Sequence, residues 1–142
     1  MSTPIAAEIF CICEGALQGN GALSIDRAYS RMAVPSLPIR LPRLIMALRL
    51  RFDLASEGSH SLALAVTTPE GQRWGPPGAP EFNVKAEGDD AYAWTNGVVE
   101  FPPITVAVAG DYHFELAIDG RAVARCVLCI VRSQLPSEVH AG

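Results

Sequence analysis

The feature that most constrains this chain is the alternation of apolar and polar side chains along its most apolar segments. Apolar residues occupy every second position in three stretches, Leu44–Phe52, Leu62–Val66 and Tyr112–Ile118. A period of two places successive side chains on opposite faces of a β-strand, whereas a helix needs a period near 3.6. No stretch of about twelve residues has the helical period. The chain is therefore expected to be all-β, with little or no helix.

Weaker strand signals and turn signals surround these three segments. The weaker strands are expected at Ile9–Cys13, Leu23–Asp26, Val98–Phe101, Ile104–Val108 and Val123–Val131. Reversals are expected at Asn20-Gly21, Pro69–Gly71 and Asp119-Gly120, because Asn-Gly and Asp-Gly favour tight hairpins. Seven or eight short strands separated by turns are typical of an antiparallel Ig-like or Greek-key β-sandwich.

The chain is expected to form one domain, residues 1–142, with an ordered core at about residues 5–133. Its 142 residues, of which 49% are hydrophobic, suffice for a single core. Val34–Pro42 is too rich in proline for a helix or a central strand and should run extended over the surface. Residues 74–96, which contain Gly75–Gly78, are expected to form one long irregular excursion.

Tyr112 lies two residues after Gly110, where a strand is expected to begin. In Greek-key sandwiches a tyrosine in such a position often bonds back to the preceding loop, as a tyrosine corner. A plain core tyrosine is the alternative, and both interpretations stay open.

Composition and charge weaken several classes of function. The formal net charge is −4, with 11 Lys and Arg against 15 Asp and Glu, so a nucleic-acid partner is not expected. No apolar run is long enough for a transmembrane helix, and the first residues do not have the pattern of a signal peptide. A cytoplasmic location is therefore expected, with the four cysteines reduced.

The order of these features carries a resemblance. It consists of an N-terminal strand with a Gly/Asn turn, Val34–Pro38, Leu41–Leu44, Leu48–Phe52, and Gly110–Leu116 leading to Asp119-Gly120. Across Ile9 to Val131 the chain resembles a family of uncharacterised bacterial β-sandwich domains of about this length. The resemblance implies the sandwich fold. It implies no activity, and it transfers no functional residues.

The cysteines are the first candidates for chemistry. Cys11, Cys13, Cys126 and Cys129 match in number the four thiolates of a structural zinc site. A spacing of three, however, puts Cys126 and Cys129 on opposite faces of a strand. Buried structural thiols are expected, with no metal and no cofactor. A zinc site and a disulfide are the alternatives.

Other polar motifs do not favour catalysis. His60, His113 and His140 lie in no metal-binding frame, and the chain has no Gly-x-Ser-x-Gly elbow. Gly15–Gly21 is interpreted as a hairpin rather than a phosphate loop, because a strand follows it. Glu87–Asp90 is interpreted as a solvated loop, since one acidic cluster supplies too few ligands for calcium.

Two groups of side chains are candidates for binding. The aromatic group, in the expected excursion, comprises Trp74, Phe82, Tyr92 and Trp94. It is expected either to form a recognition patch or to pin the excursion onto a sheet. The basic group comprises Arg40, Arg43, Arg49 and Arg51, with Arg121, Arg125 and Arg132 on the last strand. It would dock an acidic partner, or it is an ordinary charged surface that protects strands from aggregation.

Some apolar side chains fall on the expected outer faces of the sheets. They are Ile45, Ala47, Ala63, Ala65, Val127 and Cys129. A covered outer face favours self-association, so a homodimer is expected. The leading hypothesis is a non-catalytic protein-interaction or structural module. The alternatives are a small-ligand or carbohydrate binder that uses Trp74, Tyr92 and Trp94, and an enzyme or metalloprotein based on the cysteines.

Overall fold

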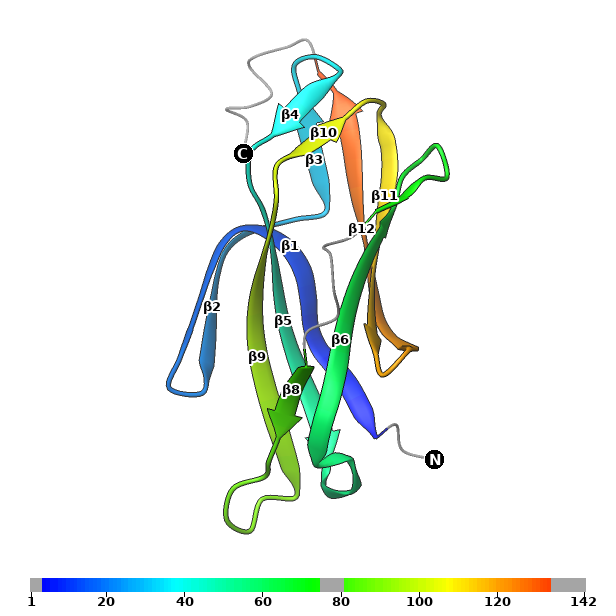
Figure 1. Ribbon diagram of the computed structural model, residues 1–142. Helices are drawn as coiled ribbons and strands as arrows, with labels where there is room; N and C mark the ends of the chain where they lie inside the picture. Colours follow the sequence, from blue (N-terminus) through cyan, green and yellow to red (C-terminus); the bar gives the residue numbers. More distant parts are fainter. Residues whose placement is uncertain (1–3, 75–80, 134–142) are drawn as a thin grey trace.

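Two β-sheets pack face to face in the computed structural model (Figure 1), which describes residues 4–74 and 81–133, with only the backbone at Trp74. The first sheet contains β1 (Ile5–Gly19), β2 (Ala22–Tyr29), β5 (Leu44–Asp53) and β9 (Tyr92–Phe101), in the order β2-β1-β5-β9. The second contains β3 (Arg31–Val34), β6 (Gly58–Thr67), β7 (Arg73–Trp74), β11 (Gly110–Ile118) and β12 (Arg121–Arg132), in the order β3-β12-β11-β6-β7. β8 (Glu81–Val84) also pairs with β6, and β4 (Ile39–Leu41) pairs with β10 (Ile104–Val106).

The expected all-β sandwich is confirmed, but it has more strands than the seven or eight predicted. Within the described residues there are twelve strands, and only β3 and β12 pair in parallel. The added strands β3, β4, β7 and β8 have two to four residues each, too few for an alternation signal. The single helical element of the described part is the 3₁₀ turn η1 (Leu54–Ser56).

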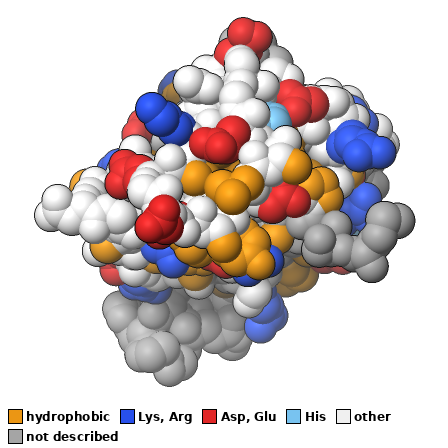
Figure 2. Space-filling model, turned by 90° about the horizontal axis from the view of Figure 1, so that it is seen from below, with side chains coloured by type: hydrophobic (Ala, Val, Ile, Leu, Met, Phe, Trp, Pro, Cys, Tyr) orange, Lys and Arg blue, Asp and Glu red, His pale blue; other side chains and the backbone are white. Residues whose placement is uncertain are grey.

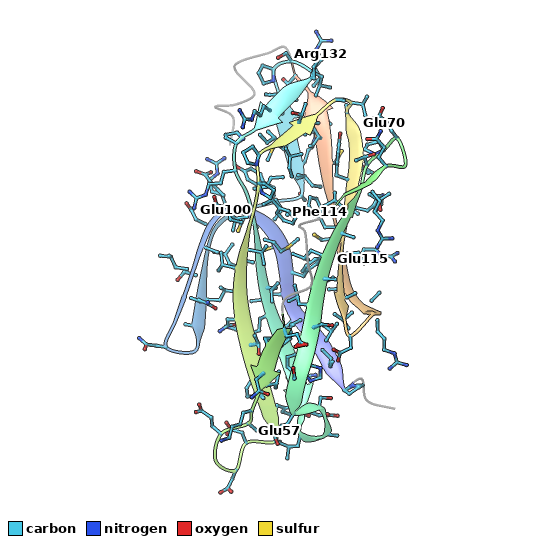
Figure 3. All side chains as sticks on the ribbon, in the orientation of Figure 1. Glu57, Glu70, Glu100, Phe114, Glu115 and Arg132 are labelled. Atoms are coloured by element: carbon cyan, nitrogen blue, oxygen red, sulfur yellow. The ribbon has the colours of Figure 1, made fainter. Side chains whose placement is uncertain are left out.

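The core lies between the two sheets and is built from the alternate positions that the sequence predicts. Leu48, Leu50 and Phe52 of β5 face Phe114 and Leu116 of β11 across it, and all are at most 1% exposed. Figure 3 shows Phe114 between the sheets and its neighbour Glu115 outside them. The period-two side-chain pattern therefore sets which face of each central strand is buried.

The strand β1 is bent, so that its second half and β2 form an arm that leaves the sheet plane (Figure 1). At the bend Arg27 has a left-handed φ of 54°, between the pairs Cys13–Ala28 and Gly15–Asp26. The arm reverses at Asn20-Gly21, whose φ angles of 53° and 72° are those of the expected tight hairpin turn.

This arm covers part of the outer face of the first sheet. Ile45 and Ala47 are 2% and 0% exposed because Ala16 and Leu23 of the arm pack against them. The argument for a homodimer from these two residues is therefore wrong, since the chain buries them itself. Beyond the arm, β5 returns to alternation, and its Arg49 is half-buried on the open outer face.

The structure corrects the expectation of one long irregular excursion at residues 74–96. Residues 74–96 include β8 and the beginning of β9, so that Tyr92 and Trp94 lie on a strand. Val34–Pro42 is neither helical nor part of a central strand, but it is extended only in part: residues 35–38 form bends, with a cis Leu37-Pro38 bond, and Ile39–Leu41 form β4. The tyrosine corner is confirmed, since the Tyr112 hydroxyl donates to the Val108 carbonyl at 2.7 Å.

Candidate aromatic cleft

A cleft of about 640 Å³ opens on the outer face of the first sheet, near the tip of the β1–β2 arm. We call it the aromatic cleft. Its lining includes Glu8, Gly21, Arg49, Lys85, Glu87, Asp90, Tyr92, Trp94 and Asn96. It therefore joins three strands of one sheet (β1, β5 and β9), the arm tip and the segment between β8 and β9.

The aromatic wall is formed by the start of β9. Tyr92 and Trp94 occupy alternate positions, so both side chains project from the outer face. They are 42% and 50% exposed, with ring centroids 6.0 Å apart at 60°. The guanidinium carbon of Arg51 lies 4.9 Å from the Tyr92 ring centroid, and its Nη1 lies 3.3 Å from Glu8 Oε2. The guanidinium of Arg51 thus stacks on the Tyr92 ring, whereas the Trp94 ring is half exposed.

Arg49 lies next to this wall. It is directly opposite Asn96 in the β5–β9 register, and its Nε donates to Asn96 Oδ1 at 2.8 Å. Within residues 4–74 and 81–133, no carboxylate forms an ion pair with Arg49. Asn96 therefore orients the guanidinium without neutralising its charge.

Acidic groups also line the cleft. Glu87 and Asp90 belong to one turn, in which the Asp90 N–H donates to the Glu87 carbonyl at 3.1 Å. The segment is held by Glu57, whose Oε2 accepts the Ala86 N–H at 2.8 Å, and Figure 3 places Glu57 at this end of the molecule. Figure 2, which views this end, shows acidic side chains around an apolar patch. The cleft thus offers charged groups of both signs beside an aromatic surface.

The structure brings together some of the expected site residues and separates others. Tyr92, Trp94 and Arg49 line the aromatic cleft, and Arg51 supports it through Tyr92. Phe82 points the other way and packs against the core, with its ring centroid 5.9 Å from that of Phe52. For Phe82, the interpretation as a pin that holds the segment on the sheet is the one that fits.

Other expected binding residues lie away from the cleft. The side chain of Trp74 falls outside the described residues. Arg40 is on β4, and Arg43 is paired with Glu100 at 3.5 Å. The basic strip is therefore split between two places.

Sequence reasoning missed Glu8, Lys85 and Asn96, which also line the cleft. Asn96 carried a usable signal, because it lies two residues after Trp94 and shares its face on a continuous strand. No sequence signal indicated that the arm tip lines the cleft, because its position depends on the bend in β1.

His60 forms a separate arrangement beside a hollow of about 400 Å³. Its Nδ1 lies 2.6 Å from Asp119 Oδ2, and its Nε2 lies 2.5 Å from the Ser56 carbonyl oxygen. Ser61 N–H donates to the other Asp119 oxygen at 2.9 Å. A catalytic triad would direct Nε2 to a nucleophile. Here both nitrogens face acceptors, so the pair is a structural clasp between β6 and the β11–β12 turn.

The cysteines do not assemble a metal site. All four are free thiols, and within the described residues no group of three or more His, Cys, Asp or Glu side chains is placed to hold a metal ion. Cys126 faces inward and accepts a backbone hydrogen bond from Ile12, and burial raises the pKa of its thiol to about 11. The expected structural role of buried thiols fits Cys13 and Cys126.

Comparison with known families covers most of the chain. Residues 8–131 match the family of unknown function DUF6941. The chain belongs to this family. The resemblance to an uncharacterised family of β-sandwich domains is thereby confirmed, and DUF6941 membership assigns no activity to the cleft. No curated protein matches the chain.

Two solved structures are similar to this DUF6941 domain. One is the Pseudomonas fluorescens alkylpurine DNA glycosylase AlkC, bound to DNA containing an abasic site analog, with a TM-score of 0.51 and 10% identity. The match covers 90% of this chain but only 30% of the glycosylase chain. The other is an immunoglobulin-like protein from Pseudomonas aeruginosa, with a TM-score of 0.34 and 17% identity over 91% of this chain and 93% of that one. At 10% identity the likeness to the glycosylase describes the fold alone.

Within the described residues no helix is long and apolar enough to cross a membrane.

Proposed function

We propose that this DUF6941 domain is a non-catalytic binding module whose aromatic cleft takes a carbohydrate. The observation that carries the proposal is the convergence of Trp94, Arg49 and Asn96 on one cleft of about 640 Å³. This volume lies within the range of about 300–1,000 Å³ that is usual for small-molecule sites.

The chemistry of the cleft suits a polyhydroxylated ring. A sugar has an apolar C–H face, which packs on an exposed aromatic ring, and hydroxyl groups that both donate and accept hydrogen bonds. Trp94 is half exposed and offers such a ring. Among the lining side chains, Glu87 and Asp90 are acceptors, whereas Arg49 and Lys85 are donors. A mixed lining of this kind fits hydroxyl groups better than it fits a purely apolar ligand.

The walls are also held in place before any ligand binds. β9 pairs with β5 over all ten of its residues, so Trp94 stands on a rigid strand rather than on a loop. The bond between Glu57 and the Ala86 N–H tethers the segment that carries Glu87 and Asp90. Binding to a preorganised site costs less conformational entropy. This raises the affinity for a ligand such as a carbohydrate, whose contacts alone give only modest affinity.

Tryptophan fluorescence tests the proposal directly, because the chain has only two tryptophans. The variant Trp74→Phe leaves Trp94 as the sole reporter, and titration with a panel of neutral and acidic oligosaccharides is expected to give a saturable change. The matched variant Trp94→Phe, titrated by calorimetry with the same sugar, is expected to bind at least about tenfold more weakly. If no oligosaccharide in the panel binds the wild-type protein, the proposal fails.

The edge of β9 favours a second candidate function, the docking of a protein partner. β9 is the last strand of its sheet, and its ten residues contain no proline, lysine or recorded bulge. Natural edge strands usually carry such protection, and an unprotected edge is a template for another strand. A second copy of this chain is the partner that we propose for this edge. The domain would act in the cytoplasm, where its four thiols stay reduced.

Light scattering coupled to size-exclusion chromatography tests this second candidate. The wild-type protein is expected to gain mass as its concentration rises, and Thr95→Lys, which adds a charge at the β9 edge, is expected to remain monomeric. A wild-type protein that is monomeric at the highest concentration would remove self-association through this edge.

A further inference from the structure

Among the described residues, Arg49 and Arg51 are the two half-buried arginines, and of these two only Arg51 has a carboxylate partner. Each of five arginines has a carboxylate within 4.0 Å, in the pairs Arg27–Glu14, Arg43–Glu100, Arg51–Glu8, Arg73–Glu115 and Arg125–Glu115. Arg49 is half-buried, yet in the described part of the chain its only side-chain partner is the neutral amide of Asn96. A half-buried guanidinium that is oriented by a neutral amide and has no carboxylate partner is favourably placed to bind an anion.

We propose that the ligand of the aromatic cleft is an acidic sugar whose carboxylate binds Arg49. The inference rests on the proposed function, since it names the class of carbohydrate that the same cleft would take. Asn96 occupies Nε, so the two terminal nitrogens of Arg49 remain for the ligand. These two nitrogens form a planar fork that matches the two oxygens of a carboxylate.

The neighbours of Arg49 determine what surrounds the carboxylate. Trp94 and Asn96 are two positions apart on β9 and therefore project from the same face. A ring stacked on Trp94 would hold an acidic substituent beside Arg49. This adjacency favours a sugar acid, in which the carboxylate is attached to the ring itself, over a free inorganic anion.

The same cleft disfavours a densely charged polyanion. Glu87 and Asp90 line it together with Arg49 and Lys85, and Glu8 is already paired with Arg51. These charges nearly cancel, so one carboxylate is accommodated at Arg49 while phosphates spaced along a nucleic acid would meet Glu87 and Asp90. Recognition of a single carboxylate among hydroxyl groups is the outcome that satisfies both kinds of charge.

A pair of probes that differ only in charge tests the inference. The probes are the methyl glycoside of galacturonic acid, a single ring with one carboxylate, and its methyl ester, which has the same ring but no carboxylate charge. In calorimetry the wild-type protein is expected to bind the acid about ten- to a hundredfold more tightly than the ester. Arg49→Gln is expected to abolish this preference, while Arg43→Gln, at an ion pair outside the cleft lining, is expected to retain it.

Asn96→Ala is the second variant, and it keeps the guanidinium while removing the group that orients it. An intermediate loss of the preference for the acid, with unchanged thermal unfolding, would support the positioning of Arg49 by Asn96. Equal affinity of the wild-type protein for acid and ester would overturn the inference and leave carbohydrate binding standing. Binding of neither probe would also overturn it, and the wider oligosaccharide panel then decides the proposed function separately.

Discussion

Tyr112 shows how one side chain secures a corner of the sandwich. Its ring is in the core, where it is 3% exposed, and its hydroxyl reaches back to the Val108 carbonyl at 2.7 Å. The bond closes the bend that leads into β11 at Gly110, where φ is 139°. Because the hydroxyl is buried, its hydrogen bond contributes more than an exposed one would.

The variant Tyr112→Phe is expected to lower the free energy of unfolding by about 1–2 kcal/mol, because it leaves the Val108 carbonyl without this donor. Urea unfolding followed by circular dichroism measures the change. Tyr29→Phe is the matched control, since the Tyr29 hydroxyl makes an exposed bond to Glu14 at 3.3 Å. Its expected effect is below about 0.5 kcal/mol. Equal effects of the two variants would contradict the role assigned to the corner.

Cys126 is a half-buried thiol whose pKa is raised by its surroundings. Burial and the nearby Cys11 both raise its pKa, to about 11, so at pH 8 only about one molecule in a thousand carries the reactive thiolate there. Alkylation of the folded protein followed by mass spectrometry is expected to leave Cys126 unmodified. The same reagent should label it after denaturation. Rapid labelling of Cys126 in the native state at pH 8 would contradict this expectation.

At the scale of strands, the sequence predicts a strand when its apolar side chains are the buried ones and its polar side chains are the exposed ones. β5 and β11 alternate large apolar with polar side chains over most of their length, and the sequence reveals both. The first half of β9 alternates in exposure but not in hydropathy, because Trp94 faces outward while Ala93 faces inward. Gly97 weakens the pattern further. A Cβ there would lie 3.1 Å from Leu48 Cδ1, so a larger residue at this position would push the Leu48 side chain aside by a few tenths of an ångström.

The candidate cleft was predictable only as a set of residue types. Exposed aromatic and arginine side chains indicated Trp94 and Arg49, but nothing in the sequence showed that they share one face. The β1–β2 arm was found as a hairpin, although its bend over the sheet was not. The bend depends on long-range packing of Leu23 on Ile45, which no local pattern encodes.

The arm offers a test with an internal control. Leu23 packs on the cluster that contains Ile45 and Ala47, whereas Leu17 lies on the other face of the arm and is 77% exposed. Leu23→Ala is expected to cost about 1–2 kcal/mol of unfolding free energy, less than a fully buried leucine would, because Leu23 is only half-buried. Leu17→Ala is expected to change it by less than about 0.5 kcal/mol. Equal effects in chemical denaturation would show that the arm does not cover the sheet.

At the scale of the whole molecule, the two sheets are joined at one end by the crossover from β5 through η1 to β6. The His60 clasp fastens this crossover, because His60 bonds both to Ser56 in η1 and to Asp119 in the β11–β12 turn. The ring also contacts Phe52 and Phe82 of the core, at centroid distances of 5.2 and 5.9 Å. The protonation state of His60 therefore affects how strongly this end of the sandwich is held closed.

Both nitrogens of His60 face acceptors, so the imidazolium makes one more hydrogen bond here than neutral histidine can. The Ser56 carbonyl raises the pKa of His60, and Asp119 raises it further, although burial opposes them. The hydrogen bond from the Ser61 N–H lowers the pKa of Asp119 most, and the hydrogen bond from His60 lowers it further. A raised histidine pKa stabilises the fold below about pH 6.5, and this contribution disappears as the pH rises through the raised value. A lowered aspartate pKa stabilises the fold above about pH 4, and this contribution disappears as the pH falls through the lowered value.

The clasp is thus expected to contribute most between about pH 4 and pH 6.5. The difference in unfolding free energy between wild type and His60→Gln should be larger at about pH 5.5 than at about pH 8.5. Glu57 and Arg121 line the same hollow, so both stay unchanged in the comparison. A His60→Gln difference that is independent of pH would mean that the imidazolium does not hold this end of the sandwich together.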